Sequence, residues 1–166
     1  MSNKSLIESF LKSYQGRNAR EMAVCYRPQA HFEDIAFRLD GRPQIYAMWH
    51  LVCANKKLRV DVISVEEKSS NEVVAEIVVH YEFPSDADPP ESARMVINRI
   101  TSRFEFSDGL IAIHTDECDA ADWGRQAMGG VKGFVAGHVG LVRRRAAKKK
   151  LQSHLEKNPG LLADTP

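Results

Sequence analysis

Two residues in the second half of the sequence, His114 and Asp116, have the types and the spacing for proton transfer. They stand two positions apart in a segment, 110–118, whose composition predicts a β-strand. Side chains two apart on a strand point the same way, about 7 Å apart. An imidazole beside a carboxylate titrates near neutral pH and can move a proton. The same pair could also be a satisfied, buried hydrogen bond without a chemical role, and both interpretations stay open.

The other histidines and the cysteines do not form a metal-binding pattern. Ligand spacing is absent from these residues, which are His31, His50, His80, Cys25 and Cys53. Cys118 has no base placed to activate it, so a small hydrophobic role is favoured over that of a nucleophile. We therefore expect neither a metal nor a cofactor.

The bulk properties of the chain exclude several classes of protein. A length of 166 residues suits one domain, and a net charge of +1 gives no reason to expect nucleic acid or an anionic membrane. The odd number of cysteines, 3, fits a reducing compartment. Neither a signal-peptide core nor an apolar run of ~20 residues is present. The basic run 143–150 lacks interleaved aromatic residues and indicates a solvated helix face. We expect a cytoplasmic protein with no nucleic-acid and no membrane partner.

The elements that must position His114 and Asp116 begin with three helices. Apolar residues recur at helical spacing over 6–14 and 45–52, and Asn18 with Glu21 resembles a capping box for a short helix over 19–26. Pro28 is expected to end that helix, with a short strand over 31–34 after it.

From residue 58 onward the pattern alternates as in strands. Strands are predicted over 58–64, 73–83, 94–106 and 110–118, with a hairpin turn at 107–109. Helices followed by such a meander predict an α+β fold with an antiparallel sheet. Beyond it we expect a short helix near 122–128, a basic helix over 143–155 and a disordered end over 159–166.

Four segments in this order resemble the nuclear transport factor 2-like superfamily, which includes SnoaL-like polyketide cyclases, ketosteroid isomerase and limonene epoxide hydrolase. They are 31–34 (His-Phe-Glu-Asp), 40–42 (Asp-Gly-Arg), the aromatic hairpin 103–111, and 114–119 followed by Trp123. The last one is similar to a bacterial branch of the superfamily. The resemblance implies a cone, in which three N-terminal helices wrap a curved antiparallel sheet around an internal pocket. It assigns this domain to residues 1–130 and leaves 131–166 as a basic helical extension with a disordered end.

The resemblance also assigns side chains to the pocket. It turns Leu110, Ala112, His114, Asp116 and Cys118 inward from the last strand. The ligand-binding residues expected from it are Tyr14, Tyr26, Phe32, Phe37, Trp49, Asn98, Ser102 and Cys118.

Asp34 stands where relatives similar to ketosteroid isomerase have their general base. A carboxylate in an apolar cavity is expected to have a raised pKa, because burial disfavours its ionised form. The Tyr and the protonated Asp of the steroid-isomerase oxyanion hole correspond here to Phe10 and Ser102, so steroid isomerisation is not expected. Alternatively, Asp34 caps the next turn or pairs with Arg42.

The sharpest functional hypothesis is a catalytic set of Asp34, His114 and Asp116 at the polar end of an apolar cavity. Such a set could abstract a proton next to a carbonyl of a small, apolar, oxygenated molecule, as an isomerase or cyclase does. Two alternatives remain. One is a non-catalytic binder of a small apolar molecule, and the other is an interaction module. In either case we expect a homodimer through the convex sheet face, which includes Val78 and His80.

Overall fold

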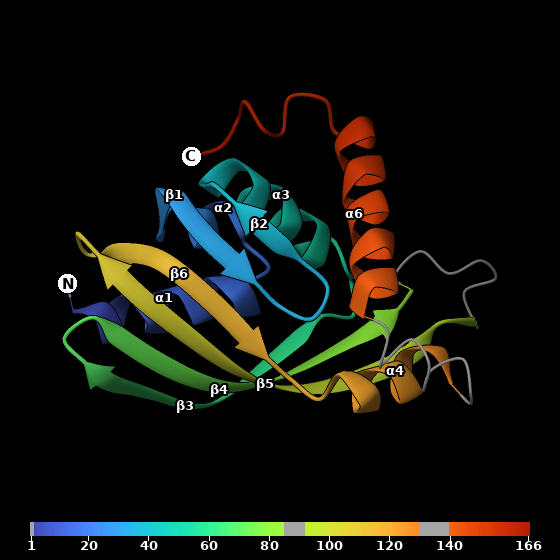
Figure 1. Cartoon of the computed structure of the whole chain (residues 1–166), viewed down its shortest axis with the longest axis horizontal. Coiled ribbons are helices and arrows are strands. Elements are labelled where there is room, and N and C mark those ends of the chain that lie inside the picture. Colours follow the sequence, from blue (N-terminus) through green and yellow to red (C-terminus); the bar gives the residue numbers. More distant parts are fainter. Residues whose placement is uncertain (1, 85–91, 130–139) are drawn as a thin grey trace.

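A single curved sheet of six strands organises the molecule, with helices packed on its concave side (Figure 1). The computed structural model describes residues 2–84, 92–129 and 140–166. The strands are β1 (Tyr26–Glu33), β2 (Arg38–Asp40), β3 (Arg59–Ser69), β4 (Glu72–Phe83), β5 (Arg94–Ser107) and β6 (Leu110–Glu117). Their order in the sheet is β2-β1-β6-β5-β4-β3. The predicted α+β cone is confirmed.

One strand pair departs from the predicted antiparallel meander. β1 pairs antiparallel with β2 but parallel with β6, so that Phe32 lies opposite His114. The predicted helix boundary is also wrong, because the second helix ends at Ala23 and Tyr26 already belongs to β1. Pro28 lies where the β1–β6 register is irregular, and a proline is tolerated there because no ladder hydrogen bond needs its nitrogen.

The long strands β3 to β6 form the predicted hairpins. Val79 lies opposite Asn98 on β4 and β5, and the turn between β5 and β6 has positive φ angles at Asp108 and Gly109. These angles, 54° and 74°, are those of a two-residue turn that matches the twist of the flanking strands.

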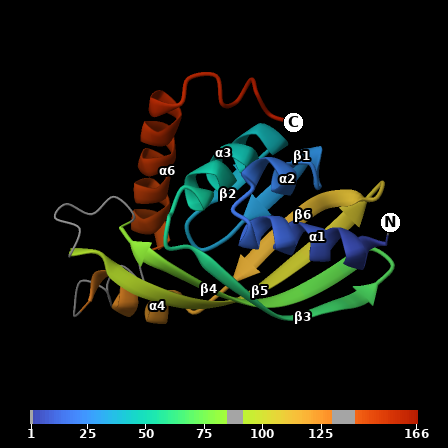
Figure 2. The same cartoon turned by 180° about the vertical axis from the view of Figure 1, so that it is seen from behind.

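Three helices from the first third of the chain cover the concave face (Figures 1 and 2). They are α1 (Asn3–Gln15), α2 (Ala19–Ala23) and α3 (Arg42–Cys53). The Asn18 side chain accepts from the Glu21 backbone nitrogen at 3.1 Å and so caps α2 as expected. The apolar face of α1 buries Ile7, Phe10, Leu11 and Tyr14.

An aromatic cluster joins these helices to the sheet. The ring of Phe10 lies 5.7 to 5.9 Å, edge to face, from the rings of Tyr26, Trp49 and Phe104. Such pairs each add about 0.5–1.5 kcal/mol beyond the burial of their area. His114 belongs to the same cluster, with its ring centroid 4.1 Å from that of Phe104.

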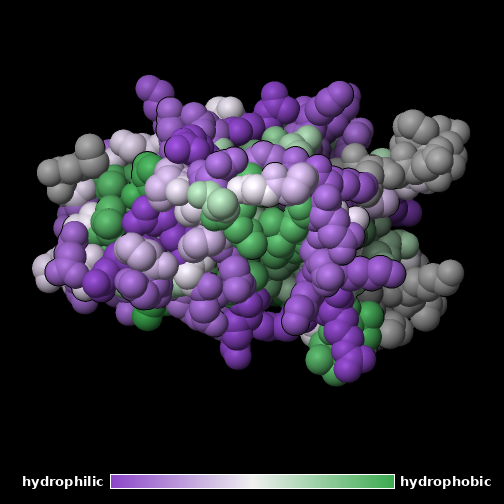
Figure 3. Space-filling model, turned by 90° about the horizontal axis from the view of Figure 1, so that it is seen from above, coloured by the Kyte–Doolittle hydropathy of each residue, from purple (hydrophilic) through white to green (hydrophobic). Residues whose placement is uncertain are grey.

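The C-terminal region is part of the fold. α4 (Ala120–Met128) follows β6, and α6 (Gly140–Lys157) stands beside α3 (Figure 1). The prediction of a disordered end is wrong, since Leu161 is only 8% exposed and Arg20 donates to the Asp164 carbonyl at 3.0 Å. Residues 131–139 of the predicted extension lie outside the described ranges. Seen from above, the surface is largely hydrophilic with smaller hydrophobic patches (Figure 3).

Candidate functional site

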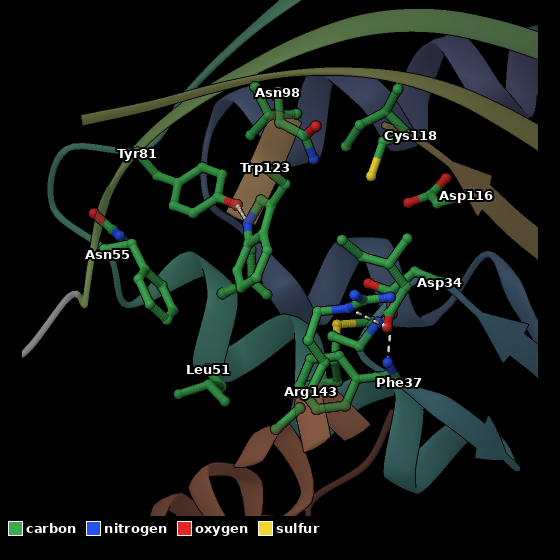
Figure 4. A pocket seen from close by; sticks show the side chains of 18 of the residues that line it. Asp34, Phe37, Leu51, Asn55, Tyr81, Asn98, Asp116, Cys118, Trp123 and Arg143 are labelled. Atoms are coloured by element: carbon green, nitrogen blue, oxygen red, sulfur yellow. Dashed lines mark hydrogen bonds between the residues drawn. The ribbon is translucent and has the colours of Figure 1, made fainter. Parts of the chain in front are cut away.

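A cavity of about 330 Å³ lies between the concave sheet face, α3, α4 and α6. Most of its wall is apolar, with aromatic rings from Phe32, Phe37 and Trp49. Polar side chains on the wall include Tyr14 and also Asp34, Asn55, Tyr81, Asn98, Asp116 and Arg143, which Figure 4 labels. A site of this size and character suits a small, largely apolar molecule.

The structure brings together most of the residues that the sequence assigned to the pocket. Those that line the cavity are Tyr14, Phe32, Asp34, Phe37, Trp49, Asn98, Asp116 and Cys118. Tyr26, Ser102 and His114, also expected there, are not on the wall and are at most 1% exposed. They lie behind it, because the aromatic cluster around Phe10 fills the narrow end of the cone.

Asp34 follows the last residue of β1 and begins the tight connection to β2. Its Oδ1 accepts hydrogen bonds from the backbone nitrogens of Ala36, at 2.7 Å, and of Phe37. Its own backbone nitrogen donates to the Phe37 carbonyl at 3.0 Å. Asp34 thus caps its own turn, as one of the two interpretations held. It makes no ion pair with Arg42.

The pKa of Asp34 is raised to about 6, chiefly because the carboxylate is buried. The two backbone hydrogen bonds oppose this shift, and the nearby charge of Asp116 adds to it. Among the described residues, no group donates a hydrogen bond to the second oxygen, Oδ2. A carboxylate with this pKa is a stronger base than an ordinary aspartate and is still mostly ionised at neutral pH.

Asp116 reaches the cavity from β6 and is held by two buried side chains. Its Oδ1 lies 2.8 Å from His114 Nε2 and accepts from the Ser102 hydroxyl at 2.5 Å. His114 Nδ1 lies 2.6 Å from the Tyr26 hydroxyl, to which the Trp49 indole nitrogen donates at 3.1 Å. The network therefore combines residues of β1, α3, β5 and β6.

The hydrogen-bond partners fix the direction of this network. An ionised carboxylate can only accept, so His114 carries a proton on Nε2 and donates it to Asp116. In a neutral imidazole Nδ1 is then the acceptor and takes the hydrogen of the Tyr26 hydroxyl, whose oxygen accepts from the Trp49 indole N–H. All donors along the network point toward the Asp116 carboxylate. His114 is thus a buried, hydrogen-bonded partner of Asp116, as the second interpretation of the pair held.

A β-bulge changes which β6 residues face inward. Phe106 pairs with Ile111 and Glu105 pairs with Ile113, so Ala112 is an extra residue on β6. Ile111 is fully buried, whereas uninterrupted alternation from His114 would have turned Leu110 and Ala112 inward. The predicted inward orientation is therefore wrong for Leu110 and Ala112, which precede or form the bulge. It is correct from His114 onward.

The parallel pairing of β1 with β6 explains why the two carboxylates meet. Phe32 lies opposite His114 and Glu33 opposite Thr115, and this register sets Asp34 beside Asp116 where both strands end. Figure 4 shows both carboxylates on the same side of the cavity.

Helix α6 holds the turn that carries Asp34. Arg143 donates from Nε to the Ile35 carbonyl at 3.1 Å, and Arg144 contacts Glu33 at 2.8 Å. Glu33 also pairs with Arg38, and the hydrogen bonds from both guanidinium groups lower its pKa to about 2. The C-terminal helix, which the sequence indicated only as a basic solvated face, is thus a wall of the cavity.

Tyr81 and Trp123 are wall residues that were not assigned to the site from the sequence. Tyr81 had a signal, because alternation along 73–83 puts it on the buried face of β4. No sequence pattern placed Trp123 on the cavity wall, since its position depends on how α4 packs against β5. Gln126 Nε2 donates to the Ile97 carbonyl, and the Ile97 nitrogen donates to Gln126 Oε1, at 3.0 and 2.8 Å. The Gln126 side-chain amide thus hydrogen-bonds to the backbone of β5 at Ile97, in a part of β5 that does not pair with β6.

The chemistry of the site rests on carboxylates and hydroxyls. Within residues 2–84, 92–129 and 140–166, no group of three or more His, Cys, Asp or Glu could hold a metal ion. Burial raises the pKa of the Cys118 thiol, which disfavours its nucleophilic thiolate. No helix in the described ranges is long and apolar enough to cross a membrane.

Comparison with known proteins identifies relatives of this architecture. The model of the SnoaL-like domain matches residues 7–114. A candidate polyketide cyclase from Pseudomonas putida superposes with a TM-score of 0.66 at 16% identity, covering 76% of this chain and 98% of its own. No curated protein matches the sequence.

Two further solved structures share the fold. An epoxide hydrolase of M. tuberculosis, similar to limonene epoxide hydrolase, has a TM-score of 0.59 at 19% identity and covers 84% of this chain and 94% of its own. A Catenulispora acidiphila protein with a ketosteroid isomerase-like fold, solved with trimethylamine, has a TM-score of 0.61 at 14% identity and covers 74% and 91%. At these identities the likeness concerns the fold, and the reaction must be argued from the site.

Proposed function

Because this chain belongs to the family of SnoaL-like domains, we propose that it binds a small, apolar, oxygenated molecule and transforms it by acid–base chemistry of the isomerase or cyclase type. The observation that carries the proposal is the Asp34 carboxylate, which has a pKa of about 6 on the wall of an apolar cavity of about 330 Å³. A general base works best when its pKa lies near the working pH.

Asp34 is assigned the role of the base that removes a proton next to a carbonyl. Its Oδ1 is engaged by the backbone, so Oδ2 is the oxygen that would receive the proton. The carbonyl of such a molecule needs a donor as negative charge develops on its oxygen. The Tyr14 hydroxyl, on the cavity wall, makes no hydrogen bond with any described residue and can supply one.

Asp116 is the second carboxylate of the site, and its orientation is fixed by His114 and Ser102. Its charge opposes ionisation of Asp34 and so contributes to the raised pKa of the base. We assign His114 as a positioning residue, because it is 1% exposed, lies behind the cavity wall and hydrogen-bonds to Asp116.

Hydrogen exchange of a ketone in heavy water tests the proposed chemistry. The protein is incubated in D₂O near neutral pD with a panel of small apolar ketones that carry a second oxygen far from the carbonyl, including 6-methoxy-1-tetralone, and loss of the α-hydrogen signals is followed by NMR. We expect faster exchange with the protein, and Asp34→Asn should slow the protein-dependent rate roughly 10²–10⁴-fold.

The matched control for this experiment is Glu117→Gln, which removes an exposed carboxylate next to Asp116 in sequence. Its exchange rate should equal that of the wild type. If the Asp34→Asn variant exchanged the ketone as fast as the wild type, Asp34 would not be the base.

Binding without turnover is the second candidate function. It is supported by the same apolar wall and by the hydrogen bonds from Ser102 and His114 that hold Asp116 Oδ1. Ketones that bind to the protein but show no accelerated exchange would favour this function over the first.

We also propose that two copies of the chain associate through the convex sheet face. Three large apolar side chains on β5 and β6 support this, since Met95, Ile97 and Ile113 are 51, 49 and 38% exposed. Sedimentation equilibrium of the wild type should give the dimer mass, and Ile97→Lys should give the monomer. A monomeric wild type would contradict the proposal.

A further inference from the structure

Tyr81 and Trp123 form a hydrogen-bonded pair on the cavity wall that the proposed chemistry does not use. The Trp123 indole nitrogen lies 2.7 Å from the Tyr81 hydroxyl oxygen. Because an indole N–H can only donate, the Tyr81 oxygen is the acceptor in this contact. Among the described residues, no group accepts the hydrogen of the Tyr81 hydroxyl itself.

The pair occupies a fixed place at a distance from the carboxylates. Figure 4 shows Tyr81 and Asn55 at one end of the cavity and Asp34 at the other, with the Trp123 ring reaching in between. Tyr81 is held by the β4–β5 register opposite Val96. Trp123 is held by α4, which Gln126 joins to the backbone of Ile97.

Two physical effects make this hydroxyl a good donor to a ligand. Its oxygen accepts the Trp123 hydrogen, and hydrogen bonds in such a chain strengthen one another. Burial also raises the pKa of Tyr81, so the group keeps its proton. The Tyr81 residue lies on the cavity wall, where the oxygen of a bound ligand can accept its hydroxyl hydrogen.

We propose that Tyr81, oriented by Trp123, donates a hydrogen bond to an acceptor oxygen of the ligand at the end of the cavity opposite Asp34. The ligand class is then an apolar molecule with an acceptor oxygen, such as a ketone or ester carbonyl, remote from the carbon on which Asp34 acts. This inference rests on one part of the proposed function, which is that the cavity binds a small apolar molecule.

A matched pair of probes separates this hydrogen bond from apolar binding. 2-Acetylnaphthalene and 2-isopropenylnaphthalene have nearly the same shape, but only the ketone carries an acceptor oxygen. Dissociation constants are measured by isothermal titration calorimetry for the wild type, Tyr81→Phe and Trp123→Phe. We expect the wild type to prefer the ketone roughly threefold to tenfold, the effect of one net hydrogen bond.

Tyr81→Phe should abolish the preference and leave the affinity for 2-isopropenylnaphthalene unchanged. Trp123→Phe should reduce the preference, because the hydroxyl loses the group that orients it. The ¹³C signal of a carbonyl-labelled ketone should move downfield on binding to the wild type and move less with Tyr81→Phe. Cooperative urea unfolding with an unchanged slope establishes that each variant keeps its packed interior.

The possible failures can be told apart. Equal binding of both probes by the wild type would overturn the role of Tyr81 and leave the cavity as a binding site. A preference retained in Tyr81→Phe but lost in Tyr14→Phe would also overturn it, because the ketone oxygen would then lie against Tyr14. Binding of neither probe would count against the proposed function as well.

Discussion

Asp34 and Asp116 reach the same cavity from neighbouring strands, yet their surroundings differ. Asp116 accepts hydrogen bonds from His114 and Ser102, and its support continues through buried side chains to Tyr26 and Trp49. Among the described residues, Asp34 receives hydrogen bonds only from the backbone of its own turn. One carboxylate is thus held by buried side chains of the core, whereas the other is held by the backbone of the short connection between β1 and β2.

The difference extends to the elements behind each carboxylate. The network behind Asp116 lies inside the aromatic cluster, where Phe104 and Phe32 flank the His114 ring at 4.1 and 5.0 Å. The turn of Asp34 is contacted by α6 through partly exposed arginines, such as Arg144 on Glu33. A carboxylate with buried hydrogen-bond donors can serve stability, whereas the carboxylate proposed as the base is kept where burial disfavours its charge.

Removing the centre of the buried network should have the largest effect on stability. His114→Ala leaves an empty space among aromatic rings and removes the hydrogen-bond partners of Tyr26 and Asp116. We expect a loss of roughly 3–5 kcal/mol in the free energy of unfolding, measured by urea denaturation. The control His80→Ala removes a histidine on the outer face, paired with Asp61, and should lose less than about 1 kcal/mol. Equal losses would contradict a special role for the network.

Removing the charge of Asp34 should stabilise the protein at neutral pH. A pKa near 6 in the folded chain, against an ordinary 3.8, means that the folded state binds more protons between these pH values. Stability therefore falls as pH rises through this window, by up to about 3 kcal/mol. Asp34→Asn keeps the Oδ1 acceptor, so we expect about 1–3 kcal/mol of added stability at pH 7. The gain should vanish below about pH 4, where both forms are neutral.

The same substitution at the second carboxylate should have the opposite sign. Asp116→Asn weakens the hydrogen bonds from His114 and Ser102, because an amide oxygen is a poorer acceptor than a carboxylate. We expect a loss of roughly 1–2 kcal/mol at pH 7, from thermal and urea unfolding. If Asp116→Asn stabilised the chain as Asp34→Asn does, the contrast between the two sites would not hold.

The smallest effect concerns the docking of α6 behind Asp34. His154 on α6 lies 2.8 Å from His50 on α3, and burial, His50 and Lys157 together lower its pKa. The unfolded chain therefore takes up a proton at higher pH than the folded chain, and stability falls as pH drops below 6.5. His154→Gln should lessen this fall, measured by unfolding at mildly acidic and neutral pH. An unchanged pH dependence would show that the α3–α6 contact does not titrate.

Strand alternation and helix spacing, together with the family resemblance, were sufficient for the parts of the site that lie on regular elements. Tyr14, Trp49 and Asn98 line the cavity as expected, because the face of a residue follows from its position in a regular element. Tyr81 was on the correct face for the same reason, although it was not assigned to the site.

The errors fall where the chain departs from regular geometry. The bulge at Ala112 shifted the inner face of β6, and the early start of β1 placed Tyr26 in the core rather than on the cavity wall. A bulge needs one extra residue in one strand, and alternation alone does not reveal which one.

The sequence by itself determined the α+β architecture, the long hairpins and the presence of chemically capable residues at Asp34, His114 and Asp116, because hydrophobic period and turn chemistry are local properties. Only the tertiary structure decided that His114 lies behind Asp116, that α6 forms a wall, and that Trp123 meets Tyr81. Each of these depends on contacts between elements far apart in the chain, such as the parallel pairing of β1 with β6. The sequence identified the individual residues as candidates, and the packing of the whole domain decided how they are arranged as a site.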